Sequence, residues 1–198
     1  MFIPTAWRTV LTKKLQRFFW IYLTKNFVIV GMDDFQVREA ARKCAFVRIT
    51  TNNYFRVAEF RDKNRGSEYR DKLAREEIGF FAELGDTMVG SIWATMNRSQ
   101  SPAIARGYMR LMPNEALIHD IVTGEKSRGL GVGPFMVGRM ASILLKEFGV
   151  SRIIIDVNIK NNSSLRMMAK AGLRVREQVL AISAFGKLAF EMVLRRYV

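Results

Sequence analysis

The sequence predicts a mixed α/β domain, in which a central mixed sheet is flanked by helices, with a helical extension ahead of it. Two observations indicate this fold class. From residue 45 onward, apolar stretches with strand character alternate with segments of helical periodicity. One stretch, residues 152–157, is almost continuously apolar, as expected for a strand covered on both faces. We therefore divide the chain into an N-terminal extension, residues 1–44, and a main domain, residues 45–198.

The extension is basic and has an aromatic stripe at helical spacing. The stripe consists of Trp7, Leu11, Leu15, Phe18 and Tyr22. This pattern predicts an amphipathic helix that packs its apolar side on the main domain, with peripheral docking on an anionic membrane as the alternative. A second short helix is expected from Asp33 to about Lys43, where Asp33 or Asp34 can act as the N-cap.

The main domain reads as alternating strands and helices. Strands are expected at residues 46–50, 78–83, 88–96, 107–112, 116–123, 152–157, 179–183 and 188–194. Helices are expected at residues 53–62, 67–77, 132–148 and 163–170, with a loop over 97–107. The turn at residues 84–86 suits a hairpin because Gly and Asp tolerate positive φ, and Gly172 is placed to end the last helix.

Composition excludes several protein classes. The 198 residues are 49% hydrophobic and include 14 Phe, 11 Met and 3 Trp, which is too apolar for a disordered chain. Cys44 is the only cysteine, so neither an internal disulfide framework nor a Cys/His metal site is expected, and a reducing cytoplasm fits best. The longest aliphatic and aromatic run, residues 18–23, is far shorter than the roughly 20 residues of a membrane-spanning helix. The first seven residues lack a basic signal region, so no secretory signal is expected.

The charge balance requires an anionic partner. There are 32 Lys and Arg against 18 Asp and Glu, a formal net charge of +14. Nucleic acid, an anionic membrane surface, and an acidic protein or phosphate-bearing cofactor are the three candidate partners.

Residues 123–133 carry the most informative motif. Gly129, Gly131 and Gly133 alternate between an expected strand and a long helix, so their backbone N–H groups can converge at the positive end of the helix dipole and bind phosphate. Arg128 adds a permanent cation. The spacing does not match a P-loop, which requires Gly-Lys-Ser/Thr, or the dinucleotide motif Gly-x-Gly-x-x-Gly.

With this motif the sequence resembles the GCN5-related N-acetyltransferase (GNAT) superfamily. Residues 128–133 match its signature, Arg/Gln-x-x-Gly-x-Gly/Ala. Residues 161–164 and 170–173 are similar to its second motif, Asn-x-x-Ala/Ser followed by Lys-x-Gly-Phe, with Leu173 in the last position. Residues 54–60 look like the first helix of the family. The resemblance covers roughly residues 45–198 and implies the GNAT sheet.

The resemblance also implies a donor site. Backbone amides from Gly129 through Leu130, Gly131 and Val132 to Gly133, together with Arg128, would hold the phosphate end of a pantetheine thioester. Ile121, Val122 and Thr123 would pair with the pantetheine arm as an added strand and polarise the thioester carbonyl. Asn161 and Ser164 would contact it from the other side, and Asn161 is also a candidate helix N-cap. No permanently bound cofactor and no metal is implied.

His119, the only histidine, is the candidate general base. It falls on the strand where many family members place a proton relay, and a neutral imidazole can take a proton from the attacking ammonium. Strand alternation puts Glu115 on the same face as His119, as the reserve candidate, and Asp120 on the opposite face. The tyrosine that protonates the leaving thiolate in many relatives is replaced by Met168, so the general acid is left unassigned.

Within the superfamily, the sequence resembles bacterial long-chain N-acyl amino acid synthases, which are related in fold to acyl-homoserine lactone synthases. That resemblance implies transfer of a fatty acyl group from acyl carrier protein to the α-amine of an amino acid, with tyrosine the favoured acceptor. The helix at residues 54–60 and Arg61 are candidates to bind the carboxylate of the acceptor, but a solvated surface position is the favoured role for Arg61. An acidic carrier would suit the charge of +14, and its docking surface is expected to combine the N-terminal helix with the region beside Arg128.

Two alternatives remain. One is an acetyl-CoA-dependent N-acetyltransferase that acts on a small amine or a protein N-terminus. The other is a non-catalytic module that binds nucleic acid or membrane. The intact glycine motif argues against the second alternative, so no nucleic-acid partner is expected.

Overall fold

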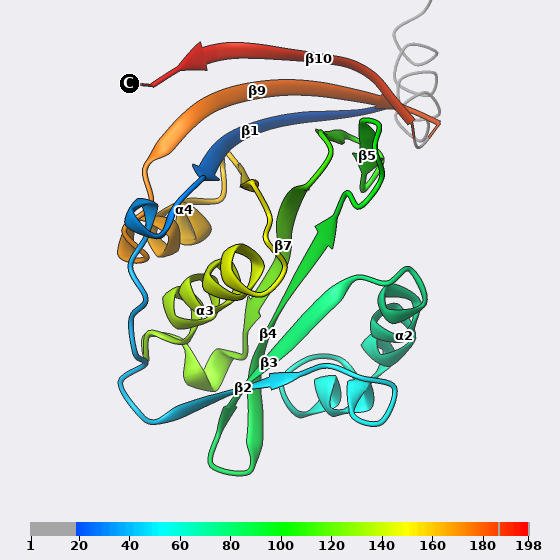
Figure 1. Ribbon diagram of the computed structural model, residues 1–198. Coiled ribbons are helices and arrows are strands. Elements are labelled where there is room, and N and C mark those ends of the chain that lie inside the picture. The colour runs from blue at the N-terminus through cyan, green and yellow to red at the C-terminus, as the bar shows by residue number, and fades with distance from the viewer. Residues whose placement is uncertain (1–18, 186, 198) are drawn as a thin grey trace, which may run out of the picture.

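The computed structural model describes residues 19–185 and 187–197, which form a large mixed sheet with helices on both faces (Figure 1). The strand order is β10-β9-β1-β8-β7-β4-β3-β2. The bounds are β1 Phe19–Ile29, β2 Cys44–Arg48, β3 Ile78–Leu84, β4 Thr87–Met96, β7 Glu115–Thr123, β8 Arg152–Asn158, β9 Val175–Ala184 and β10 Lys187–Arg196. Strands β7 and β8 run parallel, whereas the other neighbours in this sheet are antiparallel. The predicted fold class is confirmed.

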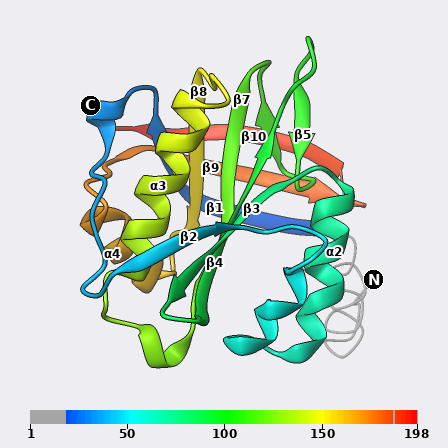
Figure 2. The same cartoon turned by 60° about the horizontal axis from the view of Figure 1, so that its bottom comes forward.

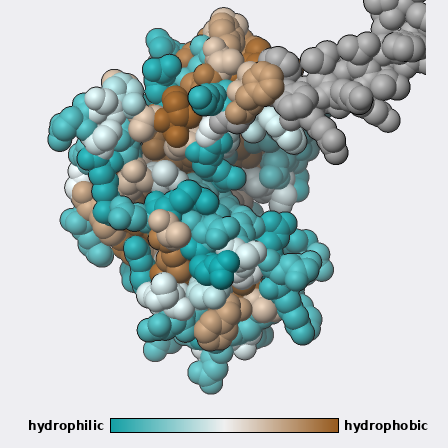
Figure 3. Space-filling view, turned by 90° about the vertical axis from the view of Figure 1, so that its right-hand side faces the viewer, coloured by the Kyte–Doolittle hydropathy of each residue, from teal (hydrophilic) through white to brown (hydrophobic). Residues whose placement is uncertain are grey.

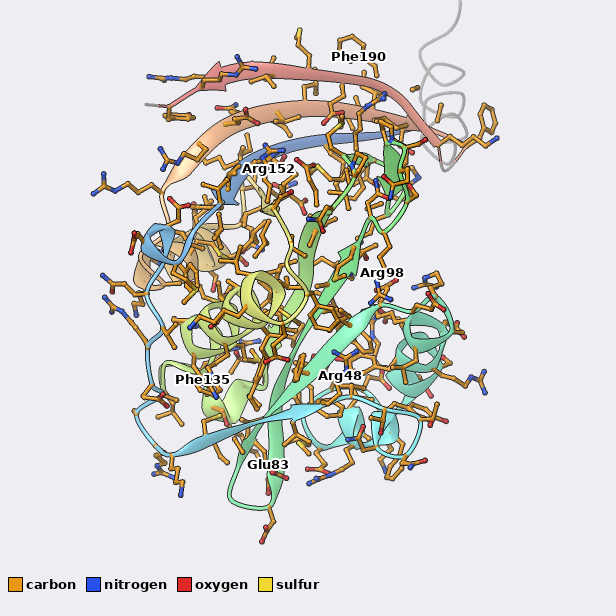
Figure 4. The ribbon with its side chains drawn as sticks, viewed as in Figure 1. Arg48, Glu83, Arg98, Phe135, Arg152 and Phe190 are labelled. Atoms are coloured by element: carbon orange, nitrogen blue, oxygen red, sulfur yellow. The ribbon has the colours of Figure 1, made fainter. Side chains whose placement is uncertain are left out.

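Two layers of helix cover the sheet on opposite faces (Figure 2). The helices are α2 Gly66–Ala74, α3 Val132–Lys146 and α4 Asn162–Lys170, with short 3-10 segments η1 Met32–Asp34, η2 Tyr54–Glu59, η3 Lys63–Arg65 and η4 Glu125–Ser127. Helices α3 and α4 pack on the face that carries Phe80 and Ile118, and the ring of Phe135 reaches from α3 to Phe46, at a centroid distance of 5.9 Å (Figure 4). Helix α2 and turn η2 pack through Tyr69 and Val57 on the opposite face.

A small hairpin covers the α2 face nearer β1. It consists of β5 Ala103–Ala105 and β6 Met109–Leu111, within and beyond the expected loop over 97–107. Leu111 and Tyr108 pack on Leu117 of β7 and Ile154 of β8, and Tyr108 stacks on Tyr22 of β1 at a centroid distance of 4.1 Å. The hairpin thus lies over the point where the two parallel strands are paired.

The predicted helix of the extension is wrong from Phe19 onward, because this segment is strand β1, inserted between β8 and β9. Its backbone pairs with both neighbours, and the apolar residues that fit a helical stripe fit strand alternation as well: Phe27 and Ile29 are buried on one face. The stripe residues Trp7 to Phe18 lie outside the described residues, as does the docking surface predicted for them.

The helix predicted for residues 33–43 is also wrong. Only η1 forms there, and the following segment runs extended across the ends of α3 and α4. The backbone N–H groups of this segment bond to other elements instead of to a helix of their own: Gln36 N donates to Ala171 O at 2.9 Å, and Ala41 N donates to Leu130 O at 2.8 Å. Gly138 makes the approach feasible, because a Cβ there would lie 2.8 Å from Gln36 O.

The outer strands leave apolar side chains exposed. Trp20 and Ile21 of β1 are 57% and 70% exposed, and Phe190 projects outward from β10 (Figure 4). In Figure 3, which views the α2 side, apolar residues gather at the end of the molecule that holds these strands, and the opposite end is mostly polar with a smaller apolar patch. None of the helices in the described part of the chain is long and apolar enough to cross a membrane.

Candidate functional site

The site is built where strands β7 and β8 separate. Their parallel pairing runs from Glu115 opposite Arg152 to Ile118 opposite Ile155 and stops there. Beyond that point β7 stays paired with β4, through Val122 and Thr123. The edge of β7 that faces away from β4 is therefore unpaired over the residues predicted to bind pantetheine, and its backbone groups can accept an extended ligand as an added strand.

A cavity of about 620 Å³ lies along this free edge. Ten of the residues predicted for the donor line it, and they are Ile121, Val122, Thr123, Arg128, Gly129, Gly131, Val132, Gly133, Asn161 and Ser164. Leu130 does not line the cavity: its side chain packs against the core, and its carbonyl accepts the bond from Ala41. Apart from that side chain, the structure brings the predicted donor residues together.

The glycine loop has the backbone that a phosphate cradle needs. Gly129 and Gly131 have φ values of 84° and 78°, in the left-handed region that favours glycine, and Gly131 is the N-cap residue of α3. The next residue, Val132, begins the helix, so the N–H groups of its first turn point at the cavity end. A Cβ on Gly133 would collide with the sulfur of Met167, which brings α4 close to the loop.

Two cations in this cavity were missed in the sequence. Arg166 and Lys170 of α4 line it together with Arg128, and all three are exposed. The sequence pattern that could have identified them is their spacing. They lie four residues apart in the segment after Asn161, on one side of a short helix. Asn161 is the N-cap that the sequence also allowed, because its Oδ1 accepts from Ser164 N at 3.1 Å.

We call the region where β7 and β8 separate the fork, and the point of separation its throat. A second cavity of about 180 Å³ lies at this throat. Its lining combines apolar side chains of the core with polar groups from both strands, including His119 and Asp156. His119 follows the last paired residue of β7, and Asp156 follows the last paired residue of β8, so the two lie opposite each other at the point of separation. Because Ile118 and Ile155 pack toward α3, alternation turns both polar side chains to the other face.

The imidazole of His119 is held by two partners through one nitrogen. Its Nε2 lies 2.9 Å from Thr95 Oγ1 and 3.3 Å from Glu77 Oε2. The Glu77 carboxylate favours a proton on Nε2, whereas the Thr95 hydroxyl can donate or accept. With the proton on Nε2 the lone pair is on Nδ1, which is buried and has no hydrogen-bond partner among the described residues. Glu77, which precedes β3, was not predicted as a site residue, and nothing in its local sequence marks it.

Burial sets the protonation state of this pair. Burial lowers the pKa of His119 below its usual value, although the hydrogen bond to Glu77 opposes the shift. Burial would raise the pKa of Glu77, but the hydrogen bond from His119 and the hydrogen bond and charge of Arg75 lower it. The site therefore holds a neutral imidazole beside a carboxylate at neutral pH, so that His119 can accept a proton.

Comparison with known proteins adds family information to this geometry. The family model described as the acetyltransferase (GNAT) family matches residues 35–173. The chain belongs to the GNAT family. The family suggested by the two sequence motifs is therefore confirmed.

Solved structures of GNAT proteins share the fold. A GCN5-related glucosamine N-acetyltransferase region of a fungal multi-domain β-N-acetylglucosaminidase is 15% identical, with a TM-score of 0.55, over 87% of this chain and 22% of that one. A GCN5-related N-acetyltransferase from Kribbella flavida is 9% identical, with a TM-score of 0.55, over 91% and 64%. The chain thus spans less than two thirds of either protein.

A shorter neighbour is matched over most of its length. The structure named AAC(6')-Iy, in complex with the bisubstrate analogue CoA-S-monomethyl-acetylneamine, is 12% identical with a TM-score of 0.52, over 66% of this chain and 90% of that one. At these identities the likeness is one of fold. No curated protein matches the chain significantly.

Asp120 of β7 and its partner Arg61 lie differently from what the sequence predicted. Asp120 does not point to the opposite face, because a bulge interrupts alternation: its φ is 45°, and two residues of β7 face Ile92 alone. Its carboxylate pairs with Lys72 and with Arg61, whose Nη1 lies 3.2 Å from Asp120 Oδ1. Arg61, the predicted carboxylate ligand, is therefore already paired.

Glu115, the reserve base, lies at the far end of β7. Its Oε1 is 3.0 Å from Arg152 Nη1, its Oε2 accepts from Met112 N, and it lines neither cavity described above. The structure thus does not bring Glu115 to the fork. Met168, at the position of the family tyrosine, is buried in the throat and has no proton to donate. The described residues contain no group of three or more His, Cys, Asp or Glu that could hold a metal ion.

Proposed function

We propose that this protein is an N-acyltransferase that moves an acyl group from a pantetheine thioester to an amine by direct attack. One observation carries this proposal: the unpaired edge of β7 leads from the glycine loop to a neutral histidine at the throat of the fork. A thioester laid along that edge would end beside His119, which is the arrangement that direct aminolysis requires.

The reaction needs two proton movements. The acceptor arrives as an ammonium, and the neutral imidazole of His119, which lines the throat cavity, takes one proton so that the amine nitrogen regains its lone pair. The amine nitrogen attacks the thioester carbonyl, whose oxygen gains negative charge that a backbone N–H of the free β7 edge stabilises. The carbon–sulfur bond breaks, and the thiolate leaves with the proton given up by the new amide nitrogen. No covalent intermediate on the protein is involved.

For the donor, we propose a long-chain acyl group on acyl carrier protein, in the cytoplasm. Three exposed cations line the donor cavity, as docking of an acidic carrier would require: Arg128, Arg166 and Lys170. The exposed cations Arg42, Lys43 and Lys126 are close in sequence to residues that contact or form the glycine loop. Arg42 and Lys43 follow Ala41, which is hydrogen-bonded to the glycine loop. Met167 and Met168 line the throat, and their flexible thioethers can make room for a chain longer than the present 180 Å³ accommodates. The acceptor we propose is an amino acid, with tyrosine the first choice.

The second candidate donor is acyl-CoA, and a specific observation favours it. Arg128, Arg166 and Lys170 put three cations in the cavity that would hold the phosphate end. The carrier-bound group has a single phosphodiester, whereas coenzyme A adds a pyrophosphate and a ribose phosphate that would occupy several cations.

A mass-spectrometric assay separates these possibilities. The protein is incubated with acetyl-CoA, palmitoyl-CoA or palmitoyl acyl carrier protein, each with the twenty amino acids and a set of simple amines. N-acyl amino acid formed from the carrier-bound donor supports the full proposal, whereas acetylated product from acetyl-CoA alone restricts the function to acetyl transfer. No product with any donor, together with salt-dependent binding to DNA, RNA or anionic vesicles, would indicate a non-catalytic module.

A further inference from the structure

The outer strands β1, β9 and β10 have an uncovered apolar surface on the side of the sheet that α3 and α4 cover elsewhere. Along this side of β1, the exposed fraction rises from 0% at Ile29 and 2% at Phe27, which pack in the core beneath these helices, to 70% at Ile21. Alternation places the three side chains on one face, because the pairing of β1 with β8 and β9 inserts no extra residue into β1. The helices therefore leave the first part of β1 uncovered.

Two rows of apolar side chains cross the three strands on this face. The first row includes Phe190, which is 47% exposed and projects outward from β10, and the second includes Met192, which is 44% exposed (Figure 4). An exposed group of contiguous apolar side chains of this kind marks an interaction surface. We call the two rows the outer apolar patch, and their members by register are Ile21, Ile182 and Phe190, followed by Leu23, Leu180 and Met192.

Cations lie at both ends of the outer apolar patch. On the same face of β10, Lys187 precedes Phe190 and Arg195 follows Met192. Arg195 lies in one row with Gln178 of β9 and Lys25 of β1. Within the described part of the chain, none of these three cations forms an ion pair. The patch is thus apolar at its centre and positively charged at two of its edges.

The opposite face of the same strands is charged in a different way. The three strands contain two carboxylates, Glu177 and Glu191, and the register places both on the opposite face. There Glu177 pairs with Arg196 at 3.6 Å, and Glu191 pairs with Arg110 at 3.9 Å. The cations of that face are therefore balanced locally, whereas those around the outer apolar patch are available for an anionic partner.

We propose that the outer apolar patch docks on the surface of an anionic phospholipid bilayer, where its apolar side chains enter the acyl region and its cations bind lipid phosphates. Apolar burial and electrostatic attraction together give the two contributions that stable attachment to a membrane surface requires. The six side chains of the patch offer no hydrogen-bonding group, which lipid tails do not need but protein interfaces usually use. The net charge of +14 favours the same partner. This docking does not depend on acyl transfer, so either proposal can fail without the other.

Cosedimentation of the full chain with vesicles tests the docking. Vesicles of phosphatidylcholine mixed with phosphatidylglycerol should bind the protein, and vesicles of phosphatidylcholine alone should bind it roughly tenfold more weakly, because they lack the net negative charge. Added salt should weaken binding to the mixed vesicles by screening the cations. Absence of binding to the mixed vesicles, or equal binding to both kinds, would overturn the proposal.

Residues of β10 that point to opposite faces provide matched variants. Phe190→Ser should weaken binding to the mixed vesicles about tenfold, because it removes an inserted ring. Val193→Ser is the control: Val193 is 39% exposed on the other face of the same strand, and the change should have no effect on binding. Urea unfolding of both variants shows whether the fold is retained. Equal losses of vesicle binding in the two variants contradict docking through this face.

A second pair of variants leaves the apolar rows intact, so it tests the proposal even if Phe190→Ser lowers stability. Arg195→Gln should weaken binding to the mixed vesicles about fivefold, as expected for one cation at the membrane surface. Arg196→Gln, which removes a cation that faces the other way and pairs with Glu177, should stay within about twofold of the wild type. Equal effects of the two changes would overturn the assignment of this face.

Other occupants of the outer apolar patch would give different results. If the basic N-terminal extension made the vesicle contact, all four variants would bind vesicles as the wild type does. If acyl carrier protein or a second copy of this chain occupied the patch, Phe190→Ser would weaken carrier binding in calorimetry or dissociate a dimer in sedimentation velocity, with vesicle binding unchanged. Each of these results overturns docking of the patch on lipid.

Discussion

The fork has a donor half, which holds the cavity along β7, and an acceptor half, which holds the throat cavity beside His119. These two halves are built in different ways. The donor half comes from two short chain segments, residues 121–134 and 161–170, each continuous in sequence. The acceptor half combines single residues from distant elements: Glu77, Thr95, Tyr108, His119 and Asp156. A phosphate cradle depends on backbone conformation, which a local motif determines, whereas proton transfer and acceptor binding depend on side chains that only the tertiary fold assembles.

The largest effect should come from the acceptor half. Replacing His119 with Gln keeps a polar side chain of similar volume but removes the basic nitrogen, so kcat/KM should fall about 10²–10⁴-fold. The Kd for CoA should not change, because His119 does not line the donor cavity. Thiol release measured at pH 7.5 gives the rate, and calorimetry gives the affinity. Wild-type turnover in this variant would remove His119 from the mechanism and leave the acceptor half without its base.

In the donor half, CoA binding should be lost when the backbone conformation of the glycine loop is changed. Gly131 has a φ of 78°, so an added Cβ introduces strain of roughly 1–2 kcal/mol. We expect Gly131→Ala to lower the free energy of unfolding by that amount and to weaken CoA binding about tenfold by turning the amides away. Urea unfolding and calorimetry measure the two effects.

Gly85 is the matched control for this variant. It has a φ of 60° in the β3–β4 turn, far from either cavity, and a Cβ there meets nothing within 4 Å. Gly85→Ala should therefore lose similar stability with no loss of CoA affinity. If both variants bind CoA as well as the wild type does, the loop does not act as a phosphate cradle.

The same contrast explains what the sequence could predict. The glycine loop and Asn161 were found because their function lies in local conformation, and the fold class followed from the alternation of strands and helices. Asp120 was placed on the wrong face because a bulge, which leaves no mark in the sequence, shifts alternation by one residue. Glu77 acts only through its distance to His119, which no spacing along the chain reveals.

Strand β1 was missed for a different reason. A stripe such as Phe18 and Tyr22 fits the helical period, but alternating side chains of the same segment fit a strand equally well, and only pairing with β8 and β9 decides between them. The cations of α4 also change the meaning of the net charge of +14. Arg166 and Lys170 join Arg128 at the donor cavity, so more of the excess charge can be assigned to the phosphates of the donor than Arg128 alone suggested.

A smaller effect should separate these cations from the remaining surface charge. Arg166→Gln and Lys170→Gln should each raise the Kd for CoA about 3–10-fold, because each removes one charge-assisted contact to phosphate. Arg139→Gln, on the exposed side of α3, should leave it unchanged. Titration with pantetheine, which has no phosphate, should show no difference among the variants. An equal loss with pantetheine would mean that these side chains shape the cavity instead of binding phosphate.

The smallest effect should come from the positioning residue of the acceptor half. The Glu77 carboxylate raises the pKa of His119 against the larger, opposing influence of burial. Glu77→Gln removes that charge, so the pKa of His119 should fall further, and the acid limb of kcat/KM should move to lower pH. Above the limb the imidazole is neutral in either protein, so the rate there should change less than about tenfold, a loss due to the less well held ring. Besides Glu77, the charged groups Arg106 and Lys72 act on His119, and His119 interacts electrostatically with Asp120 and Asp156; the variant alters none of these.

Glu76→Gln is the control for this experiment, because Glu76 is adjacent in sequence but exposed. It should reproduce the wild-type pH profile. A purely structural role for Glu77 would lower the rate equally at every pH, without moving the limb. A limb that stays in place in Glu77→Gln would therefore show that the limb does not report the titration of His119, and would contradict His119 as the proton acceptor of the acceptor half.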